Sequence, residues 1–260
     1  MPGTYYLPPT NFTPEEALTL IVLCHELGND SGLPFFAPAL SAAVKLESSL
    51  PGRLREQLRG VADAVRIRPQ PKNPLEDHRP VYEQLLEAVS LRRAVRIVYD
   101  SLTEWEEIGT RLNPYKLLFS RRSWYVIGRS SLHRSTRTFN VGRILEIELL
   151  DDEYTIPRGF SVDRYLGNAW HLIPEPGTDS EVLVRFDKMV AQNVAEVQWH
   201  KTQQAVFNDD GTLDFSVTVS GLREISWWIL GYGDRAEVIR PVELREIVSK
   251  HAKRMVERYK

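Results

Sequence analysis

The stretch from Arg111 to Arg143 constrains the fold of this chain most, because it is strongly basic and yet patterned like a sheet. Its 33 residues carry eight lysines and arginines and no aspartate or glutamate. The rest of the chain is acidic, since all 260 residues together have a net charge of −2. The basic residues of the stretch are Arg111, Lys116, Arg121, Arg122, Arg129, Arg134, Arg137 and Arg143.

Aromatic rings are interleaved with these charges. Guanidinium groups pair with phosphate oxygens and flat rings stack on bases, so the mixture is typical of a site for a phosphate-bearing ligand. An ordinary sheet with a solvated basic face would have the same composition, and the pattern leaves both interpretations open. The rings are those of Tyr115, Phe119, Trp124, Tyr125 and Phe139.

Short segments of alternating polarity in residues 80–155 predict a small β-barrel, introduced by a helix at 81–90. The three segments with the clearest alternation are 93–99, 123–129 and 137–143.

The alternation also predicts which side chains of these strands share a face. Tyr125, Ile127 and Arg129 fall on one face of the second strand. On the third strand, one face carries Arg137, Phe139, Val141 and Arg143, unless Gly142 marks a bulge that breaks the phase. Burying an unpaired arginine is costly, so we expect Arg137 and Arg143 at the rim of the barrel, where an anion could meet them.

The N-terminal part predicts helices followed by a linker. Thr13, Pro14 and Glu16 form a capping box with proline at the first helical position, and the helix should end near Leu27, before Gly28. Four prolines among few apolar residues predict a linker. Two more helices are expected at 37–50 and 51–67, and the linker at 68–80.

The last hundred residues follow the order β-α-β-β-α-β with an added helix, which matches a ferredoxin-like split βαβ fold. The hairpin signal is Asp209-Asp210-Gly211, and Trp227-Trp228 lies in a helix where we expect both rings in the core. The fold class is therefore α+β. The expected domains are a helical connector at 1–75, a β-barrel at 76–158 and a ferredoxin-like domain at 159–260.

No motif supports catalysis. Gly231–Ala236 fits G-x-G-x-x-A but follows a helix and precedes a strand, the reverse of a dinucleotide fingerprint. Asn29–Gly32 is best explained as a helix-ending turn. The six histidines lack ligand spacing, and the lone Cys24 cannot form an internal disulfide. We therefore expect no enzyme, no cofactor and no metal.

The chain shows neither an apolar run long enough to cross a bilayer nor a signal peptide, so we expect a cytoplasmic protein without a membrane partner.

Three segments resemble the WYL domain of bacterial transcriptional regulators: Pro114–Leu118, Ser123–Gly128 and Arg137–Ile144. Residues 170–259 are similar to the C-terminal extension of that domain, called WCX. The resemblance covers nearly the whole chain. It implies an Sm-like (SH3-like) β-barrel that acts as a ligand sensor, followed by the ferredoxin-like WCX domain.

The resemblance also implies which residues bind the effector. Five family positions match residues of this chain. The tyrosine and serine after the first strand are Tyr99 and Ser101, and the tyrosine of the signature strand is Tyr125. The two arginines are Arg137 and Arg143. Two positions in the intervening loop are Ser131 and His133, with Arg134 beside them, and Arg129 shares a face with Tyr125. Asn140 and Gly142 stand where the family has arginine and aspartate, which leaves the loop contacts open.

The resemblance implies a regulator whose winged helix-turn-helix is missing here, with residues 3–9 similar to the closing strand of its wing. We expect a nucleic-acid effector, with single-stranded DNA ahead of RNA or a small nucleotide. Other expected partners are promoter DNA, through the missing domain, and a second copy in a homodimer. The alternatives are an effector-free module that docks an acidic partner and, less favoured, an enzyme acting on nucleic acid.

Two interpretations of single residues also stay open. Tyr99 and Tyr125 could be half-buried barrel residues without a ligand, and Arg143 could pair with Glu146.

Overall fold

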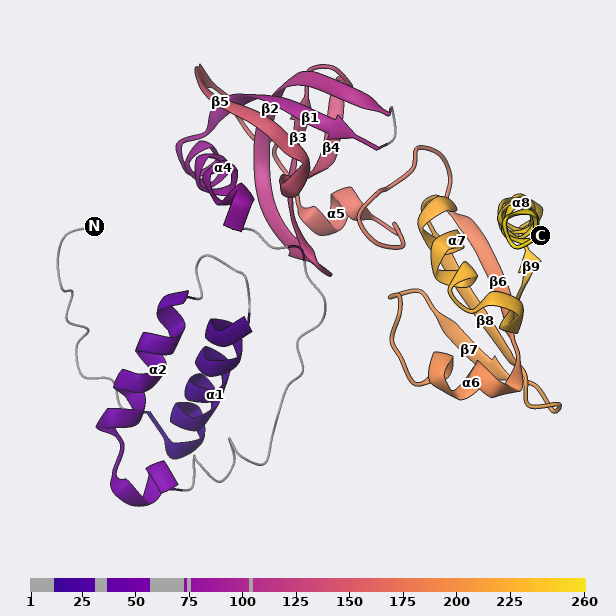
Figure 1. Cartoon of the computed structure of the whole chain (residues 1–260), viewed down its shortest axis with the longest axis horizontal. Coiled ribbons are helices and arrows are strands. Elements are labelled where there is room, and N and C mark those ends of the chain that lie inside the picture. The colour runs from indigo at the N-terminus through magenta and orange to yellow at the C-terminus, as the bar shows by residue number, and fades with distance from the viewer. Residues whose placement is uncertain (1–11, 31–36, 57–72, 74–75, 103–104) are drawn as a thin grey trace. The chain divides into compact units, whose positions relative to one another are not determined.

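A computed structural model describes residues 12–30, 37–56, 73, 76–102 and 105–260 (Figure 1). The chain divides into two compact units, Met1–Thr155 and Ile156–Lys260. No helix in the described ranges is both long enough and apolar enough to cross a membrane. The expected strand at 3–9, most of the helix at 51–67 and most of the linker at 68–80 lie outside the described residues, although 52–56 are helical.

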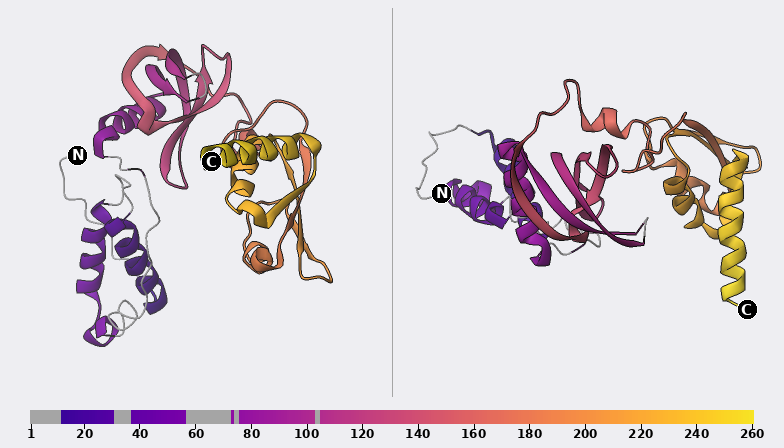
Figure 2. Two further views of the ribbon diagram at one scale, coloured as in Figure 1. Left: turned by 45° about the vertical axis from the view of Figure 1, so that its right-hand side comes forward. Right: turned by 90° about the horizontal axis from the view of Figure 1, so that it is seen from above.

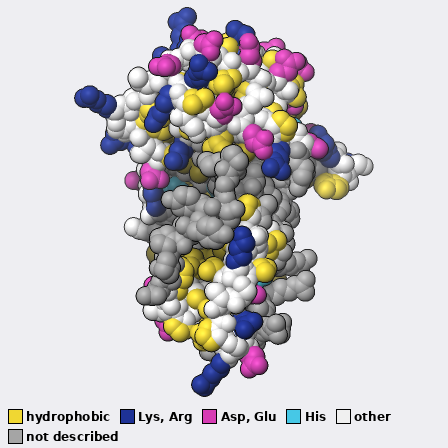
Figure 3. Space-filling model, turned by 90° about the vertical axis from the view of Figure 1, so that its left-hand side faces the viewer, with side chains coloured by type: hydrophobic (Ala, Val, Ile, Leu, Met, Phe, Trp, Pro, Cys, Tyr) yellow, Lys and Arg dark blue, Asp and Glu magenta, His cyan; other side chains and the backbone are white. Residues whose placement is uncertain are grey.

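The first two helices are α1 (Pro14–Asp30) and α2 (Ala37–Ser49). The predicted capping box is confirmed at the start of α1. The backbone N–H of Glu16 donates to Thr13 Oγ1 at 3.2 Å, and that of Thr13 donates to Glu16 Oε2 at 2.8 Å. The pair has only a small core, Ile21 and Ala43, and Figure 3 shows hydrophobic side chains on its surface.

The predicted end of α1 at Leu27 is wrong, because the helix continues through Gly28 to Asp30. A Cβ atom at Gly28 would lie 2.7 Å from Leu40 Cγ on α2. This glycine therefore allows the two helices to approach closely and does not end the first one.

The rest of the first unit is helix α4 packed on a five-stranded antiparallel sheet. The strand order β4-β3-β2-β1-β5 leaves β4 and β5 at the two edges, so the structure does not show a barrel closed by hydrogen bonds. A 3₁₀ turn, Glu76–His78, precedes α4. The elements are α4 (Arg79–Leu91), β1 (Arg93–Ser101), β2 (Glu106–Ser120), β3 (Ser123–Ser130), β4 (Ser135–Asn140) and β5 (Ile144–Glu153).

Helix α4 covers one side of this sheet with residues spaced three apart, the spacing of a single helical face. Tyr82, Leu85 and Ala88 are buried there against alternate residues of β1, such as Val95 and Ile97. Their burial places the hydrophobic core between the helix and the inner face of the sheet.

The predicted strand at 137–143 is wrong in its second half. Strand β4 ends at Asn140, whose Oδ1 accepts a hydrogen bond from the backbone N–H of Gly142 at 2.9 Å. This side-chain contact turns Val141–Arg143 into a 3₁₀ turn. Arg143 therefore does not lie on the same strand as Arg137.

The second unit confirms the predicted ferredoxin-like order. Its sheet has the order β7-β8-β6-β9, with all neighbours antiparallel, and a short helix α5 (Val162–Leu166) precedes it. The elements are β6 (Ser180–Phe186), α6 (Lys188–Ala195), β7 (Gln204–Phe207), β8 (Leu213–Val219), α7 (Arg223–Leu230), the 3₁₀ turn Gly233–Arg235, β9 (Ala236–Arg240) and α8 (Val242–Arg258).

Aromatic rings fill the core of this unit. Phe186 lies against Phe215 and Trp228, with ring centroids 6.3 and 5.4 Å away, and Trp170 stands 4.8 Å from Trp228. The prediction that both tryptophans of the pair are buried is wrong for Trp227, which is 64% exposed. Successive residues of a helix point about 100° apart, so only one of the two faces the sheet.

Candidate functional site

A polar network with a buried centre lies at one end of the five-stranded sheet, where β2 begins and the β3–β4 hairpin turns. Thr110 and Ser130 are almost fully buried, and their hydroxyl oxygens lie 2.9 Å apart. Ser130 Oγ also lies 3.0 Å from Nδ1 of His133, and Ser131 Oγ lies 3.3 Å from Thr110 Oγ1. The four side chains form one connected chain of hydrogen bonds at the edge of the core.

Phe139 brings Tyr99 and His133 to the same place. The Tyr99 ring meets it edge-on, with centroids 5.0 Å apart, and the His133 ring lies 6.4 Å away on another side. The Tyr99 hydroxyl accepts a weak hydrogen bond, 3.4 Å long, from the backbone N–H of Asn140. Two of the predicted site residues, Tyr99 and His133, thus lie against the same phenylalanine ring.

Three predicted arginines have no acidic partner in the described part of the chain. Arg134 is exposed in the hairpin turn, with a left-handed φ of 52°. Arg137 is exposed on the same face of β4 as Phe139, and Arg143 is half-buried in the 3₁₀ turn. The alternative pairing of Arg143 with Glu146 is not among the ion pairs of the described residues.

Tyr125 and Arg129 lie on the opposite face of β3. Tyr125 is paired with Asn140 in the register of β3 and β4, whereas Gly128 is paired with Arg137. Alternation along the strand therefore confirms that Tyr125 shares a face with Arg129 and separates both from Arg137. The structure divides the predicted site between two faces and does not gather it into one pocket.

Arg129 has an electrostatic effect on that second face. Burial raises the pKa of the Tyr115 hydroxyl above its usual value, and the nearby positive charge of Arg129 opposes this rise. The ring of Tyr115 lies 5.9 Å from that of Tyr154, whose hydroxyl donates to the carbonyl of Pro114. This face is built mainly from aromatic packing.

Other arginines of the sheet have acidic partners on β5. Arg93 approaches Asp151 at 3.2 Å, Arg96 contacts Glu148, and Arg111 lies 3.9 Å from Asp152. The acidic residues of β5 thus neutralise the basic side chains of β1 and the middle of β2. The arginines near the β3–β4 turn have no such neighbours among the described residues.

Ser101 is buried at the end of β1, and the loop that follows holds a residue that the sequence analysis missed. The backbone N–H of Trp105 donates to the carbonyl of Ser101 at 2.9 Å, and the Trp105 side chain is 87% exposed.

Thr110 and Ser130 were also missed, because their role depends on the register between β2 and β3. The alternation of β3 alone places Ser130 on the inner face, but it does not show the partner.

No group of three or more histidine, cysteine, aspartate or glutamate side chains that could hold a metal ion occurs within the described residues.

Comparison with known protein families finds a match within each unit. A model of the WYL domain matches residues 80–149, and a model of the WCX domain matches residues 178–256. The first match contains the five-stranded sheet up to Leu149, with the polar network and the three arginines. The second contains the ferredoxin-like sheet.

Two solved structures match this chain with low identity and TM-scores below 0.5. Proteasome accessory factor B/C (PafBC) of Arthrobacter aurescens is 17% identical, with a TM-score of 0.34 over 97% of this chain. A CRISPR Cas-related protein is 11% identical, with a TM-score of 0.47 over 85% of this chain. This chain spans 37% of the first protein's length and 62% of the second's. The two domain matches together cover more than half of the chain, which therefore belongs to the WYL family as a regulatory WYL domain followed by a WCX domain.

Proposed function

We propose that this chain is the effector-sensing part of a WYL-family transcriptional regulator, and that its effector is a nucleic acid. The observation that carries the proposal is the position of Arg134 and Arg137. They lack acidic partners among the described residues and flank a hydrogen-bonded chain of hydroxyl groups and an imidazole, which is buried at Thr110 and Ser130. Single-stranded DNA is favoured over RNA or a small nucleotide.

The proposed roles follow from the chemistry of each side chain. Arg137 and Arg143 bind phosphate oxygens, for which guanidinium groups offer two parallel donors. Tyr99 and His133 present ring edges and polar atoms to a base or sugar, and Ser101 donates to an oxygen. Trp105 adds an exposed ring on which a base can stack.

Tyr125 and Arg129 can take part although they lie on the other face of the sheet. Strand β4 is an edge strand, so only its own width separates the two faces there. A flexible polyanion that passes over this edge meets Arg137 on one side and Arg129 on the other. A small compact ligand would be confined to one of the two faces.

Two hydrogen bonds join the start of β3 to Asn73, in the segment that precedes the WYL sheet, and offer the signal a route toward the N-terminal connector. The backbone N–H of Asn73 donates to the carbonyl of Arg122 at 2.8 Å, and its side-chain amide donates to Ser123 Oγ at 2.5 Å. Strand β3 runs from this contact to Ser130 in the polar network. In the proposal, the effector binds more tightly to one of two conformations of the protein that differ at this contact. Effector binding therefore shifts the population between the two conformations. This shift changes promoter binding by a winged helix-turn-helix in a homodimer.

Fluorescence anisotropy with a 5′-labelled single-stranded oligonucleotide tests the proposal. The double variant Arg134→Gln/Arg137→Gln removes two cations that have no acidic partner within the described chain. We expect its affinity to fall about tenfold or more, because hydrogen bonds to charged groups contribute about 1.5–3 kcal/mol each. Arg143→Ala should cost about 1–3 kcal/mol by the same reasoning.

The matched control is Arg93→Gln/Arg96→Gln, which removes two cations that already pair with acids of the same sheet. Its affinity should change far less. Equal effects of the two double variants would contradict the effector site. Binding of an acidic polypeptide in place of every oligonucleotide would favour the docking module, and cleavage of the oligonucleotide with divalent metal present would favour the enzyme.

A further inference from the structure

Helix α8 of the WCX domain is exposed along most of its length. It has 17 residues, of which only Leu244 is buried. From Ser249 to the end of the chain every residue is exposed except His251, which is half-buried. The right-hand view of Figure 2 shows the helix extending past the rest of its domain. Its second half therefore adds almost nothing to the domain core.

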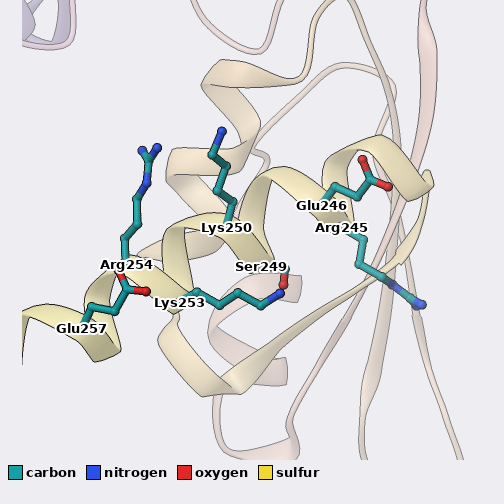
Figure 4. A pocket seen from close by; sticks show the side chains of 7 residues that line it. All are labelled: Arg245, Glu246, Ser249, Lys250, Lys253, Arg254 and Glu257. Atoms are coloured by element: carbon teal, nitrogen blue, oxygen red, sulfur yellow. The ribbon is translucent and has the colours of Figure 1, made fainter. Parts of the chain in front are cut away.

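A hollow of about 580 Å³ follows the outer face of this helix. Four lysines and arginines line it against two glutamates, so the face is net positive. Figure 4 shows the side chains of Lys250 and Arg254 extending from the helix in the same direction. The lining residues are Arg245, Glu246, Ser249, Lys250, Lys253, Arg254 and Glu257.

Ordinary helix electrostatics explain only part of this charge. Favourable interaction of cations with the helix dipole is confined to the last turn, which holds Arg258, whereas Lys250 and Arg254 lie further back. Glu246 is spaced to pair with Lys250, and Glu257 with Lys253, but neither pair is within 4.0 Å in the described structure. Even if both formed, the charge of Arg254 would stay unbalanced.

An exposed indole stands beside the same part of the helix. The ring of Trp227, on α7, lies 4.9 Å from that of His251 at an interplanar angle of 56° and is still 64% exposed. His251 is adjacent to Lys250 and one helical turn from Arg254, so the indole borders the basic face. A large flat apolar ring next to unbalanced cations offers stacking and phosphate contacts together.

We propose that α8 and Trp227 form a second contact surface for single-stranded nucleic acid, separate from the site on the WYL sheet. Lys250, Lys253 and Arg254 contact the phosphates, and a base stacks on Trp227. An acidic polypeptide would match the charge but would leave the exposed indole without a role. The proposal does not depend on the identity of the effector at the WYL site.

The test is the salt dependence of oligonucleotide binding by the full chain. The triple variant Lys250→Gln/Lys253→Gln/Arg254→Gln removes the proposed phosphate contacts and keeps good helix formers on exposed positions. Each phosphate contact to a single strand contributes about 0.7 to the slope of log affinity against log salt. We expect the slope to fall by roughly 2 and the affinity at low salt to fall at least tenfold.

A matched triple variant from the same domain controls for net charge. Arg158→Gln/Lys188→Gln/Lys201→Gln removes three exposed cations that lie outside α8 and the strand before it, and it should change the slope much less. Identical slopes for the two triple variants would overturn the proposal. Circular dichroism of both variants shows whether the fold is intact.

The stacking contact has its own test with an abasic oligonucleotide of the same length. The unmodified chain should prefer the base-bearing strand by about tenfold, since stacking contributes about 1–3 kcal/mol per base. Trp227→Ala should reduce this preference, and Trp227→Phe should restore part of it. An unchanged preference in Trp227→Ala would overturn the assignment to nucleic acid. So would a competition experiment in which polyglutamate displaces the labelled oligonucleotide as well as an unlabelled oligonucleotide does.

The two sites can fail separately. If Arg134→Gln/Arg137→Gln has no effect while the α8 triple variant loses binding, the WYL effector site fails and the α8 surface stands. The opposite result removes the α8 surface and keeps the effector site.

Discussion

The α7 side of the WCX domain and the β3–β4 turn of the WYL domain treat their charged groups in opposite ways. In the WCX domain, Glu224 accepts backbone hydrogen bonds from His171 at 2.8 Å, Leu172 at 3.2 Å and Ile173 at 3.3 Å, which ties an irregular segment to α7. At the end of the WYL sheet, Arg134 and Arg137 have no acidic partner in the described structure. A charge paired within the chain holds the fold together, whereas a charge left without a partner is available to a ligand.

Charge pairing is also found within the sheet of the WCX domain. Asp214 and Arg185 face each other across β8 and β6 with two hydrogen bonds of 2.7 and 2.8 Å, which lower the pKa of the Asp214 carboxyl below its usual value. The WYL sheet ends, at the β3–β4 turn, in a network of three hydroxyl groups and the His133 ring. The WCX sheet is therefore expected to be the more rigid framework, and the WYL end the part that responds to a ligand.

The largest expected effect is on the aromatic core of the WCX domain. Phe186→Ala removes a fully buried ring in contact with three others and should cost about 3–5 kcal/mol of unfolding free energy. Urea unfolding followed by tryptophan fluorescence measures it. Val206→Ala, at an exposed position of the same sheet, should change the free energy by less than about 0.5 kcal/mol. Similar losses for both variants would show that this core is not the rigid framework.

What the sequence predicted well depends on neighbouring residues. The capping box at Thr13 and Glu16 needs only three residues between its partners, and the order of elements in the WCX domain follows from local periodicity and the turn at Gly211. Family resemblance then added Tyr99 and Arg137, which no local pattern joins.

The features that the sequence did not predict depend on contacts between distant segments, or on a side chain that can form hydrogen bonds with more than one partner. Gly28 looks like a helix stop because its contact with Leu40 is invisible in the sequence. Asn140 ends β4 by capping a turn, an option that strand alternation does not register. The link between Thr110 and Ser130 needs the register of two strands, which alternation within each strand cannot supply.

A smaller effect is expected at the polar network of the WYL domain. Ser130→Ala removes the hydroxyl that joins Thr110 to His133 and leaves a buried hydroxyl short of a partner, which should cost about 1–3 kcal/mol. Unlike Phe186→Ala, it should also weaken oligonucleotide binding, because the network supports His133. Ser90→Ala, at an exposed serine of α4, is the control and should alter neither quantity. A loss of stability without any change in binding would make the network purely structural.

The smallest expected effect concerns the pH dependence of the WCX domain. Burial lowers the pKa of His200 below its ordinary value of about 6.5, and its ring stacks on Trp170 with centroids 5.8 Å apart. The unfolded chain therefore binds this proton more readily than the folded one. The contribution of His200 to stability is complete above about pH 6.5 and is lost as the pH falls below that value.

Thermal unfolding of the full chain between pH 7.5 and 5 measures this contribution. His200→Gln should flatten the dependence of the WCX transition on pH, because no proton is then taken up at this position. The lowered pKa of Asp214 acts in a separate, more acidic range, since a carboxyl of this kind loses its contribution only as the pH falls through its own pKa. If the unfolding temperature of the variant still falls as steeply between pH 6.5 and 5, the titrating group lies elsewhere. The pH dependence of the WCX domain then does not come from the burial of His200.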